Sequence, residues 1–324
     1  MSRLDVSAFG EILWDCFDEA PSEHGFGDRF VRRLGGAPAN VAATVARLGL
    51  GATVVGGVGD DAFGRDLRRE LAAAGVDERG ILTLPERTGL TFVSRGAGGQ
   101  PSFLFYRHET ADMRVASHHV HPSMVDARFL VVGTSTFVER KLRAASRRFV
   151  RMGLEKQGAL VVDLNVRAHL WKKLEGLADV CDELVRKASI VKASDDDVAR
   201  LPVKDAERWL RGRTKKGVLL RTHGEGGATA IGPFGEVRVS APAVQCIDAT
   251  GAGDAFLSGV LASLTRLRAT PGTQPFSEEN TWRVALEFGC ALGAKATTAE
   301  GAVTALRDLS AEVALLCALG HRDT

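Results

Sequence analysis

The chain has 324 residues, of which 45% are hydrophobic and 25% are charged, and this composition is typical of a soluble globular protein. The 42 basic and 40 acidic residues leave a net charge of +2, so we expect neither a nucleic-acid-binding nor a membrane-binding surface. Glycine is the outlier: 36 of the 324 residues are glycine, which is about 11%, whereas a proportion of about 7% is usual. An excess of glycine favours tight turns or backbone that approaches a ligand closely.

The cysteines and the apolar runs bear on the location of the protein. Five cysteines are an odd number, widely spaced and without a C-x-x-C pair, so they predict neither a disulfide framework nor a zinc site. Free thiols suit a reducing cytoplasm. Residues 1–15 lack the apolar core of a signal peptide, and no apolar run approaches the ~18 residues of a membrane span. We therefore expect a cytoplasmic protein.

Short β-branched runs alternate with helical patterns along most of the chain. The predicted strands cover residues 4–9, 52–58, 129–132, 159–164, 189–191 and 218–222. The predicted helices cover residues 37–50, 61–74, 138–154, 252–267 and 282–298. Gly51 and Gly75 are expected to end the first two helices. This alternation predicts an α/β fold with a mostly parallel central sheet flanked by helices on both faces.

One stretch interrupts the alternation. Residues 90–95 and 103–107 read as two strands joined by the glycine-rich segment 96–101, which predicts an antiparallel hairpin. Such an insertion in a parallel α/β fold is typical of a flap over a site. Since no linker or internal repeat is present, we expect residues 1–324 to form a single domain with a small β-sheet lid.

The most informative motif is DATGAGD at residues 248–254, which opens the predicted helix 252–267. Gly251 and Gly253 leave backbone amides uncovered at a helix N-terminus, and such a terminus attracts anions. Asp254 falls in the first turn, where it can accept a proton from a hydroxyl group next to a phosphate. The simpler interpretation, an ordinary helix start with a first-turn acid, explains the combination less well.

A second motif, GGAPAN at residues 35–40, enters the predicted helix 37–50. Gly35, Gly36 and a proline near the first helical position are typical of a helix start. The Asn40 amide both donates and accepts hydrogen bonds, which suits a polyhydroxylated ligand. A solvated asparagine at a plain helix start is an equally good interpretation of this segment alone.

Polar residues follow three of the predicted strands, where ligands of parallel sheets bind. After strand 159–164, Arg167 has the planar fork that holds a phosphate; the alternative is an exposed arginine in a polar loop. After strand 189–191, Asp197 ends an acidic run that suits Mg²⁺ held through water or, equally, a capped first helical turn. After strand 218–222, the glycines of THGEGG (residues 222–227) suit backbone under a nucleotide or an ordinary turn.

Several other functions are excluded by absent or unsupported motifs. The sequence has no Walker A loop, G-x-G-x-x-G, G-x-S-x-G or H-E-x-x-H. The histidines at 118, 119 and 121 have no partner acid or cysteine at ligand spacing, so a surface loop is the better interpretation. The basic stretch 140–151 carries apolar residues at helical spacing and is read as a solvated helix face.

With both motifs in this order, the chain resembles the ribokinase-like (PfkB) carbohydrate kinases over nearly its full length. The resemblance implies an α/β domain with a small β lid made from segments 11–34 and 88–108. It implies transfer of the γ-phosphoryl of ATP to a sugar hydroxyl, with Mg²⁺ as cofactor. Lid-to-lid dimers are common in such families, so a homodimer through the lid is a further expectation.

The resemblance also implies roles for particular residues. Asp254 would be the catalytic base, with the amides around Gly251, Ala252 and Gly253 binding the developing charge. The sugar-binding residues would be Asp15, Gly35, Gly36, Asn40, Arg107 and Arg167. The ATP-binding residues would be Lys192, Ser194, Thr222, Gly224, Gly227 and Thr250. Asp197 would contact Mg²⁺ through water, and Asp248 and Thr250 match positions that bind potassium in many members.

The sequence departs from the family pattern at two places. Ser194 and Asp197 stand where an asparagine and a glutamate are frequent near the magnesium, which puts the way the metal is held in doubt. Ala249 replaces a usual threonine.

The subfamily is less clearly indicated. GEILWD (residues 10–15) and FLFYR (residues 103–107) followed by Ala111 and Asp112 resemble fructokinases, so we expect phosphorylation of fructose to fructose 6-phosphate. A 2-keto-3-deoxygluconate kinase stays open, since Arg107 or Arg167 offers a cation for the carboxylate. A nucleoside kinase is disfavoured by the small aromatic content, and a non-catalytic sugar- or nucleotide-binding regulator has no need of Asp254 with its glycines.

Overall fold

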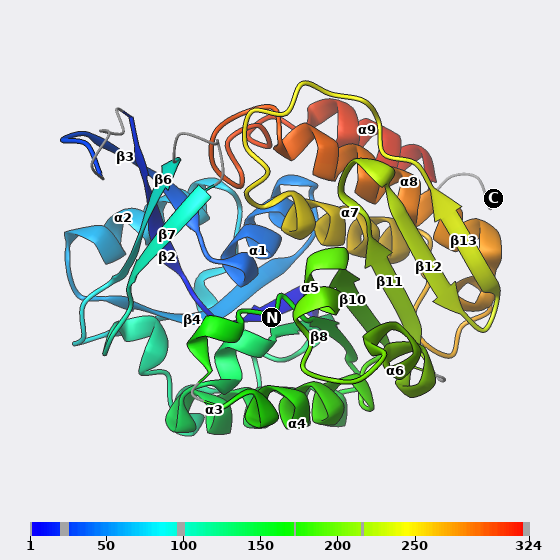
Figure 1. The fold of residues 1–324 in the computed structure, drawn as a ribbon, viewed down its shortest axis with the longest axis horizontal. Helices are drawn as coiled ribbons and strands as arrows, with labels where there is room; N and C mark the ends of the chain where they lie inside the picture. Colours follow the sequence, from blue (N-terminus) through cyan, green and yellow to red (C-terminus); the bar gives the residue numbers. More distant parts are fainter. Residues whose placement is uncertain (1, 20–25, 96–100, 172, 215–216, 320–324) are drawn as a thin grey trace.

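The computed structural model describes residues 2–19, 26–95, 101–171, 173–214 and 217–319. A nine-stranded sheet with the order β13-β12-β11-β10-β9-β8-β1-β4-β5 forms its centre (Figure 1). All neighbouring strands from β11 to β5 pair in parallel, and β12 and β13 add an antiparallel edge. The strands are β1 (Leu4–Phe9), β4 (Ala52–Gly59), β5 (Ile81–Leu84), β8 (Ala127–Gly133), β9 (Ala159–Asp163), β10 (Ile190–Ser194), β11 (Val218–Thr222), β12 (Ala228–Gly232) and β13 (Gly235–Val239).

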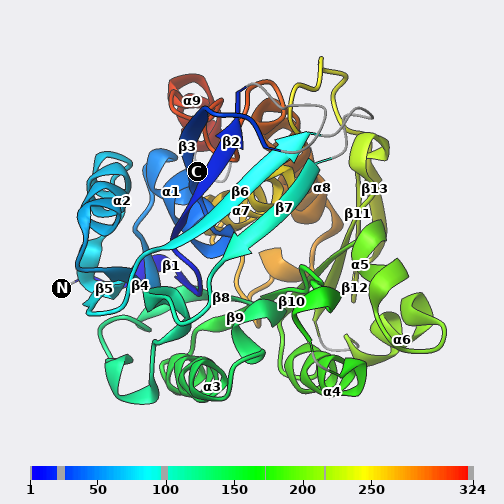
Figure 2. The same ribbon diagram turned by 60° about the vertical axis from the view of Figure 1, so that its left-hand side comes forward.

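Helices cover both faces of this sheet, as the alternation of the sequence predicts (Figures 1 and 2). One face carries α1 (Ala37–Arg47), α2 (Ala62–Ala73), α7 (Ala252–Arg266), α8 (Glu279–Ala296) and α9 (Ser310–Leu319). The other carries α3 (Arg140–Glu155), α4 (Leu174–Val185), α5 (Asp195–Arg200) and α6 (Ala206–Arg213). The predicted α/β fold with a mostly parallel sheet is confirmed.

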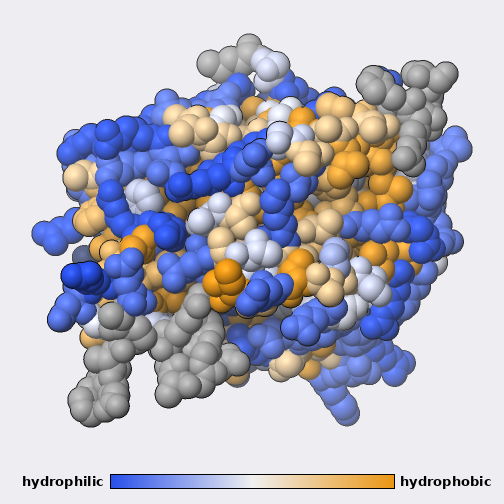
Figure 3. All heavy atoms as spheres, turned by 90° about the horizontal axis from the view of Figure 1, so that it is seen from above, coloured by the Kyte–Doolittle hydropathy of each residue, from blue (hydrophilic) through white to orange (hydrophobic). Residues whose placement is uncertain are grey.

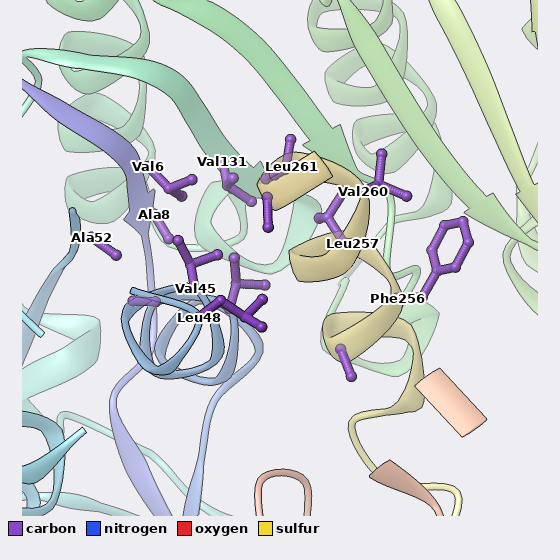
Figure 4. Packing of buried hydrophobic residues seen from close by; sticks show 14 of the residues in the cluster. Val6, Ala8, Val45, Leu48, Ala52, Val131, Phe256, Leu257, Val260 and Leu261 are labelled. Atoms are coloured by element: carbon purple, nitrogen blue, oxygen red, sulfur yellow. The ribbon is translucent and has the colours of Figure 1, made fainter. Parts of the chain in front are cut away.

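Two hydrophobic cores hold the layers together, one on each face of the sheet. In the first, Val45 of α1, Leu48 just after its end, and Leu257 and Leu261 of α7 lie against the sheet near Val131 (Figure 4). Burial of aliphatic side chains of this size contributes about 1.5–3 kcal/mol each. This core sets α1 and α7 side by side, and the N-termini of these two helices carry the two motifs.

A separate four-stranded sheet, with the order β3-β2-β6-β7, lies beside α1 and α2 (Figure 2). Its strands are β2 (Leu13–Asp18), β3 (Phe30–Gly35), β6 (Gly89–Arg95) and β7 (Pro101–Tyr106). The expected antiparallel hairpin is the β6–β7 pair, and the parallel pair β2–β6 joins it to the earlier segment. Residues 96–100 of the glycine-rich connection lie outside the described residues.

Several predicted boundaries are wrong by one to three residues, and two of them bear on the site or on a glycine singled out above. The first helix ends at Arg47, because Gly49 adopts the left-handed conformation (φ +76°) that stops the helix, two residues before Gly51. Gly75 does adopt that conformation after α2. Strand β10 continues to Ser194 instead of ending at residue 191, so Lys192 lies within the strand and not after it.

The surface is mixed in character. Hydrophobic and hydrophilic side chains are mixed on the face that lies at the top of Figure 1 and is viewed directly in Figure 3. Among the described residues, no helix combines the length and the apolar character that a membrane crossing requires. Two of the three histidines, His118 and His119, lie in a one-turn helix, Ser117–His119, and no cluster of metal-binding side chains is found in the described ranges.

Candidate active site

The N-terminus of α7 is built as the DATGAGD motif predicts. Gly251 caps the helix with φ +75°, and a β-carbon there would lie 2.3 Å from Ala302 Cβ, so only glycine fits. The amide of Ala252 donates to Ala249 O at 3.2 Å, so the neighbouring glycine amides are the better placed to meet an anion. Asp254 lies in the first turn, beside these amides.

Asn40 of α1 contacts Asp254 directly. Its Nδ2 donates to Asp254 Oδ2 at 2.8 Å, while its Oδ1 is buried and has no hydrogen-bond partner among the described residues. A buried acceptor without a partner costs about 1–3 kcal/mol, and a sugar hydroxyl would satisfy it. Gly36 (φ +97°) begins this helix, and a β-carbon there would lie 2.3 Å from Glu11 O.

A buried ion pair lies next to the same helix end. Lys192 of β10 and Asp163 of β9 are register partners, and Lys192 Nζ lies 3.0 Å from both carboxylate oxygens. A β-carbon on Gly253 would lie 2.8 Å from Nζ, so the glycine lets the ammonium group approach the N-terminus of α7. Asp163 was not among the predicted site residues, although its place at a strand end was the available signal.

Burial and charge shift the pKa values of this group. Loss of solvent and then the Asp163 carboxylate raise the pKa of Asp254 to about 7, against the opposing effects of Lys192 and Asn40. For Lys192, burial disfavours the charged form, but the surrounding carboxylates of Asp163, Asp197 and Asp254 outweigh it and raise its pKa. Asp254 is therefore able to exchange a proton near neutral pH.

The small sheet contributes a second acidic group. Asp15 of β2 packs so closely on Gly35 that a β-carbon there would lie 2.4 Å from its carboxylate. Burial and the charge of Asp254 raise the pKa of Asp15 to about 7, although Arg107 opposes this. Since the charge of Asp254 acts on Asp15, the small sheet brings Asp15 close to the N-terminus of α7.

Arg107 and Arg167 lie in different environments. Arg107 is largely buried and pairs with Asp112, with an Nη2–Oδ2 distance of 2.6 Å. Arg167 is exposed, and its charge opposes the rise that burial causes in the pKa values of Asp163 and Asp254. Arg167 therefore lies on the Asp254 side of the site, within electrostatic reach of the amides that would receive a phosphate.

The predicted nucleotide residues gather at the ends of β10 and β11. Ser194 and Thr222 are register partners, and Gly224 (φ +54°) and Gly227 (φ +89°) shape the following turn. A β-carbon on Gly227 would lie 2.0 Å from Val239 O, whereas one on Gly224 meets nothing within 4 Å.

The acidic run after β10 has a clear structural role. Ser194 caps α5, and the Asp197 carboxylate accepts hydrogen bonds from Ser194 N, Ser194 Oγ and Val166 N at 2.9, 2.8 and 2.6 Å. These bonds leave Asp197 better suited to an outer contact with Mg²⁺ through water than to direct coordination.

Asp248 braces the loop before α7. Its Oδ1 accepts from Thr250 N at 3.1 Å and Thr250 Oγ1 at 2.7 Å, and its Oδ2 accepts from Gly301 N at 2.8 Å. The side-chain oxygens of both residues are of the hard type that a monovalent cation prefers, and they also fix the loop without one.

Known proteins are similar to this chain over nearly its whole length. The model of the pfkB family carbohydrate kinase matches residues 3–309. Probable fructokinase-5 from Arabidopsis thaliana is 32% identical over 310 residues, which cover 93% of this chain and 94% of that protein.

Solved structures agree with this similarity. Fructokinase with bound ATP from Xylella fastidiosa has a TM-score of 0.85 at 29% identity and covers 96% of this chain and 97% of its own. A putative ribokinase II from E. coli in complex with ATP and Mg²⁺ has a TM-score of 0.82 at 26% identity and covers 97% of this chain and 98% of its own. The expected family is thereby confirmed: the chain belongs to the pfkB family of carbohydrate kinases.

Proposed function

We propose that this protein transfers the γ-phosphoryl group of ATP to a hydroxyl of fructose, giving fructose 6-phosphate. The similarity to fructokinases and the ATP-bound neighbour support this choice. The observation that carries it is the pairing of Asn40 with Asp254 at the N-terminus of α7, with the second oxygen of Asn40 buried and unpaired. A sugar that donates one hydroxyl proton to this oxygen would place a neighbouring hydroxyl beside the carboxylate that takes its proton.

Asp254 is the proposed general base. It accepts the hydroxyl proton as the sugar oxygen attacks the phosphorus, and the amides at the start of α7 stabilise the charge on the transferring group. Lys192, held by Asp163, lies beside Gly253 and adds positive charge there. The small sheet is proposed to close over the sugar and exclude water, which otherwise competes as the acceptor.

ATP is proposed to lie along the ends of β10 and β11, near Ser194, Thr222 and the glycines of residues 224–227. Mg²⁺, when bound, neutralises the β- and γ-phosphates, and Asp197 would hold it through water. Asp248 and Thr250 are the proposed residues for a potassium ion, whose effect the assay below measures. A cytoplasmic location remains part of the proposal.

The test is ADP release from ATP with a panel of acceptors, namely fructose, ribose, tagatose, 2-keto-3-deoxygluconate and adenosine, with and without potassium. We expect the highest kcat/KM with fructose. A higher value with 2-keto-3-deoxygluconate or adenosine would overturn the fructokinase proposal and favour the acid- or nucleoside-specific alternatives. Binding of fructose without any turnover would favour a non-catalytic regulator.

The outer face of the small sheet supports a homodimer. Phe26, Phe30, Leu104 and Tyr106 are exposed there, and rings of Phe26, Phe30 and Tyr106 pack around Phe92. The proposed occupant is the same face of a second copy. Light scattering should give a dimer for the wild type and a monomer for Tyr106→Glu; a monomeric wild type at micromolar concentration would contradict it.

A further inference from the structure

Arg107 is held by acids before any substrate arrives. Its Nε and Nη2 donate to Asp112 Oδ2 at 2.9 and 2.6 Å, and its Nη2 lies 3.8 Å from Glu11 Oε2. The Arg107 side chain is 13% exposed, that of Glu11 is 10% exposed and that of Asp112 is 0% exposed. Because all three groups are removed from solvent, their charges are weakly screened.

The two acids are fixed in place. Asp112 Oδ1 accepts from Thr110 Oγ1 at 2.6 Å and packs against Gly89, where a β-carbon would lie 2.9 Å from the same oxygen, so these contacts hold the carboxylate beside Arg107. Glu11 accepts from Ser135 Oγ at 3.3 Å. A ligand that approaches Arg107 therefore meets these carboxylates as well.

The charges on this side of the site sum to a negative value. Arg107 is one positive charge, whereas Asp112, Glu11 and Asp15 are three acids whose fields all act on it. Asp112 and Glu11 alone exceed the charge of Arg107. A substrate carboxylate placed here gains little from Arg107 and is repelled by Glu11 and Asp112, and like charges in a buried site are costly. Asp15, whose pKa is about 7, adds to this repulsion as it ionises.

The other nearby cations do not change this balance. Arg33, the register partner of Asp15 on β3, lies 3.9 Å from Glu300. Lys192 is paired with Asp163, and Arg167 acts on Asp163 and Asp254, on the side where phosphoryl transfer is proposed.

We infer that Glu11 and Asp112 are specificity-determining residues that neutralise Arg107 and make the sugar site select uncharged sugars and reject sugar acids. Arg107 then serves as a hydrogen-bond donor to hydroxyl oxygens, not as a receptor for a carboxylate. The inference rests on the proposed function, because it concerns the same sugar site.

The test compares two ligands that differ at one carbon. 2-Keto-D-gluconate is D-fructose with the C1 hydroxymethyl group oxidised to a carboxylate. Their dissociation constants are measured by calorimetry with a non-hydrolysable ATP analogue, and inhibition of fructose phosphorylation by the acid is measured in parallel. For the wild type we expect the acid to bind at least about tenfold more weakly than fructose.

Glu11→Gln keeps the size of the side chain and removes one charge. We expect it to lower the ratio of the acid's dissociation constant to that of fructose by about tenfold, and Asp112→Asn to act in the same direction. Glu155→Gln, an exposed change at the end of α3, is the matched control and should leave the ratio unaltered. The wild-type ratio needs no variant, so the inference stays testable if either substitution impairs folding.

Two results would overturn the inference: a wild type that binds 2-keto-D-gluconate as tightly as fructose, or a ratio that both charge-removing variants leave unchanged. If ATP turnover with fructose is absent but both ligands bind with the expected ratio, the proposed reaction fails while the charge selection stands. If fructose is phosphorylated but both variants leave the ratio unaltered, the charge selection fails while the proposed reaction stands.

Discussion

Asn40 Nδ2 donates a hydrogen bond of 2.8 Å to Asp254 Oδ2, although 214 residues separate them in the chain. The two residues come from the first turns of α1 and α7, which the shared core of Figure 4 holds side by side. The bond directs the Asp254 carboxylate and leaves Asn40 Oδ1 free for a substrate. The proposed base and the proposed sugar contact are therefore one unit.

Asp254→Asn removes the proposed base and keeps the shape of the side chain. We expect kcat to fall by about 10²–10⁴-fold, with the dissociation constant of fructose largely unchanged, because the hydroxyl contacts of Asn40 and Asp15 remain. Steady-state kinetics and calorimetry measure the two quantities. A variant with near-wild-type turnover would show that another group takes the proton.

The same substitution should stabilise the protein at alkaline pH. The pKa of Asp254 is about 7 in the folded protein and close to 4 in the unfolded chain. The unfolded state therefore ionises first, and the free energy of unfolding falls as pH rises from about 4 to 7. At pH 8 we expect Asp254→Asn to raise Tm by a few degrees, and at pH 4 the difference should vanish. An equal shift of Tm at both pH values would show that ionisation of the buried Asp254 carboxyl does not destabilise the folded protein.

The pH dependence of activity follows from the same raised pKa values. A base must be ionised, so kcat/KM for fructose should rise with pH through about 7 and level off above it. Asp15 also has a pKa of about 7, so the apparent values belong to the coupled pair. Asp163→Asn removes a charge that raises the pKa of Asp254, and it should move the profile to lower pH. A wild-type profile that is flat between about pH 5.5 and 9 would contradict this prediction.

Asn40→Ala should weaken sugar binding. The substitution removes both the hydrogen-bond partner of Asp254 and the unpaired oxygen that would accept from the sugar. Loss of hydrogen bonds at a buried charged site costs about 1.5–3 kcal/mol, so we expect KM for fructose to rise about 10–100-fold. Thr44→Val is the matched control, because the Thr44 hydroxyl lies one turn further along α1 and is also buried without a partner. An equal change of KM in both variants would point to a general disturbance of α1.

Gly253→Ala tests the approach of Lys192 to the helix N-terminus. The added carbon would lie 2.8 Å from Lys192 Nζ and should displace the ammonium group, which lowers kcat by at least about tenfold with a small change in Tm. Gly212→Ala is the control, since a β-carbon there would meet none of the described residues within 4 Å. Unchanged kcat in Gly253→Ala would remove Lys192 from the proposed mechanism.

Local sequence signals predicted the elements well, since a strand or a helix start depends mainly on neighbouring residues. The run at β1 and the motif at α7 are examples, and both were placed correctly. The end of α1 was missed because Gly49 and Gly51 are both plausible stops, and only the packed backbone selects Gly49. Strand β10 was cut short because Lys192 is charged, and its burial depends on Asp163 in the neighbouring strand.

By itself, the sequence determined the family, the alternation of strands and helices, and the two glycine-bearing helix starts, because these are recorded in contiguous residues. The tertiary structure alone decided the pairings: Asn40 with Asp254, Lys192 with Asp163, and Arg107 with Glu11 and Asp112. These pairings also explain part of the excess of glycine. Gly36, Gly251 and Gly253 leave no room for a β-carbon where distant segments meet, and that closeness sets the burial and the charge of the site.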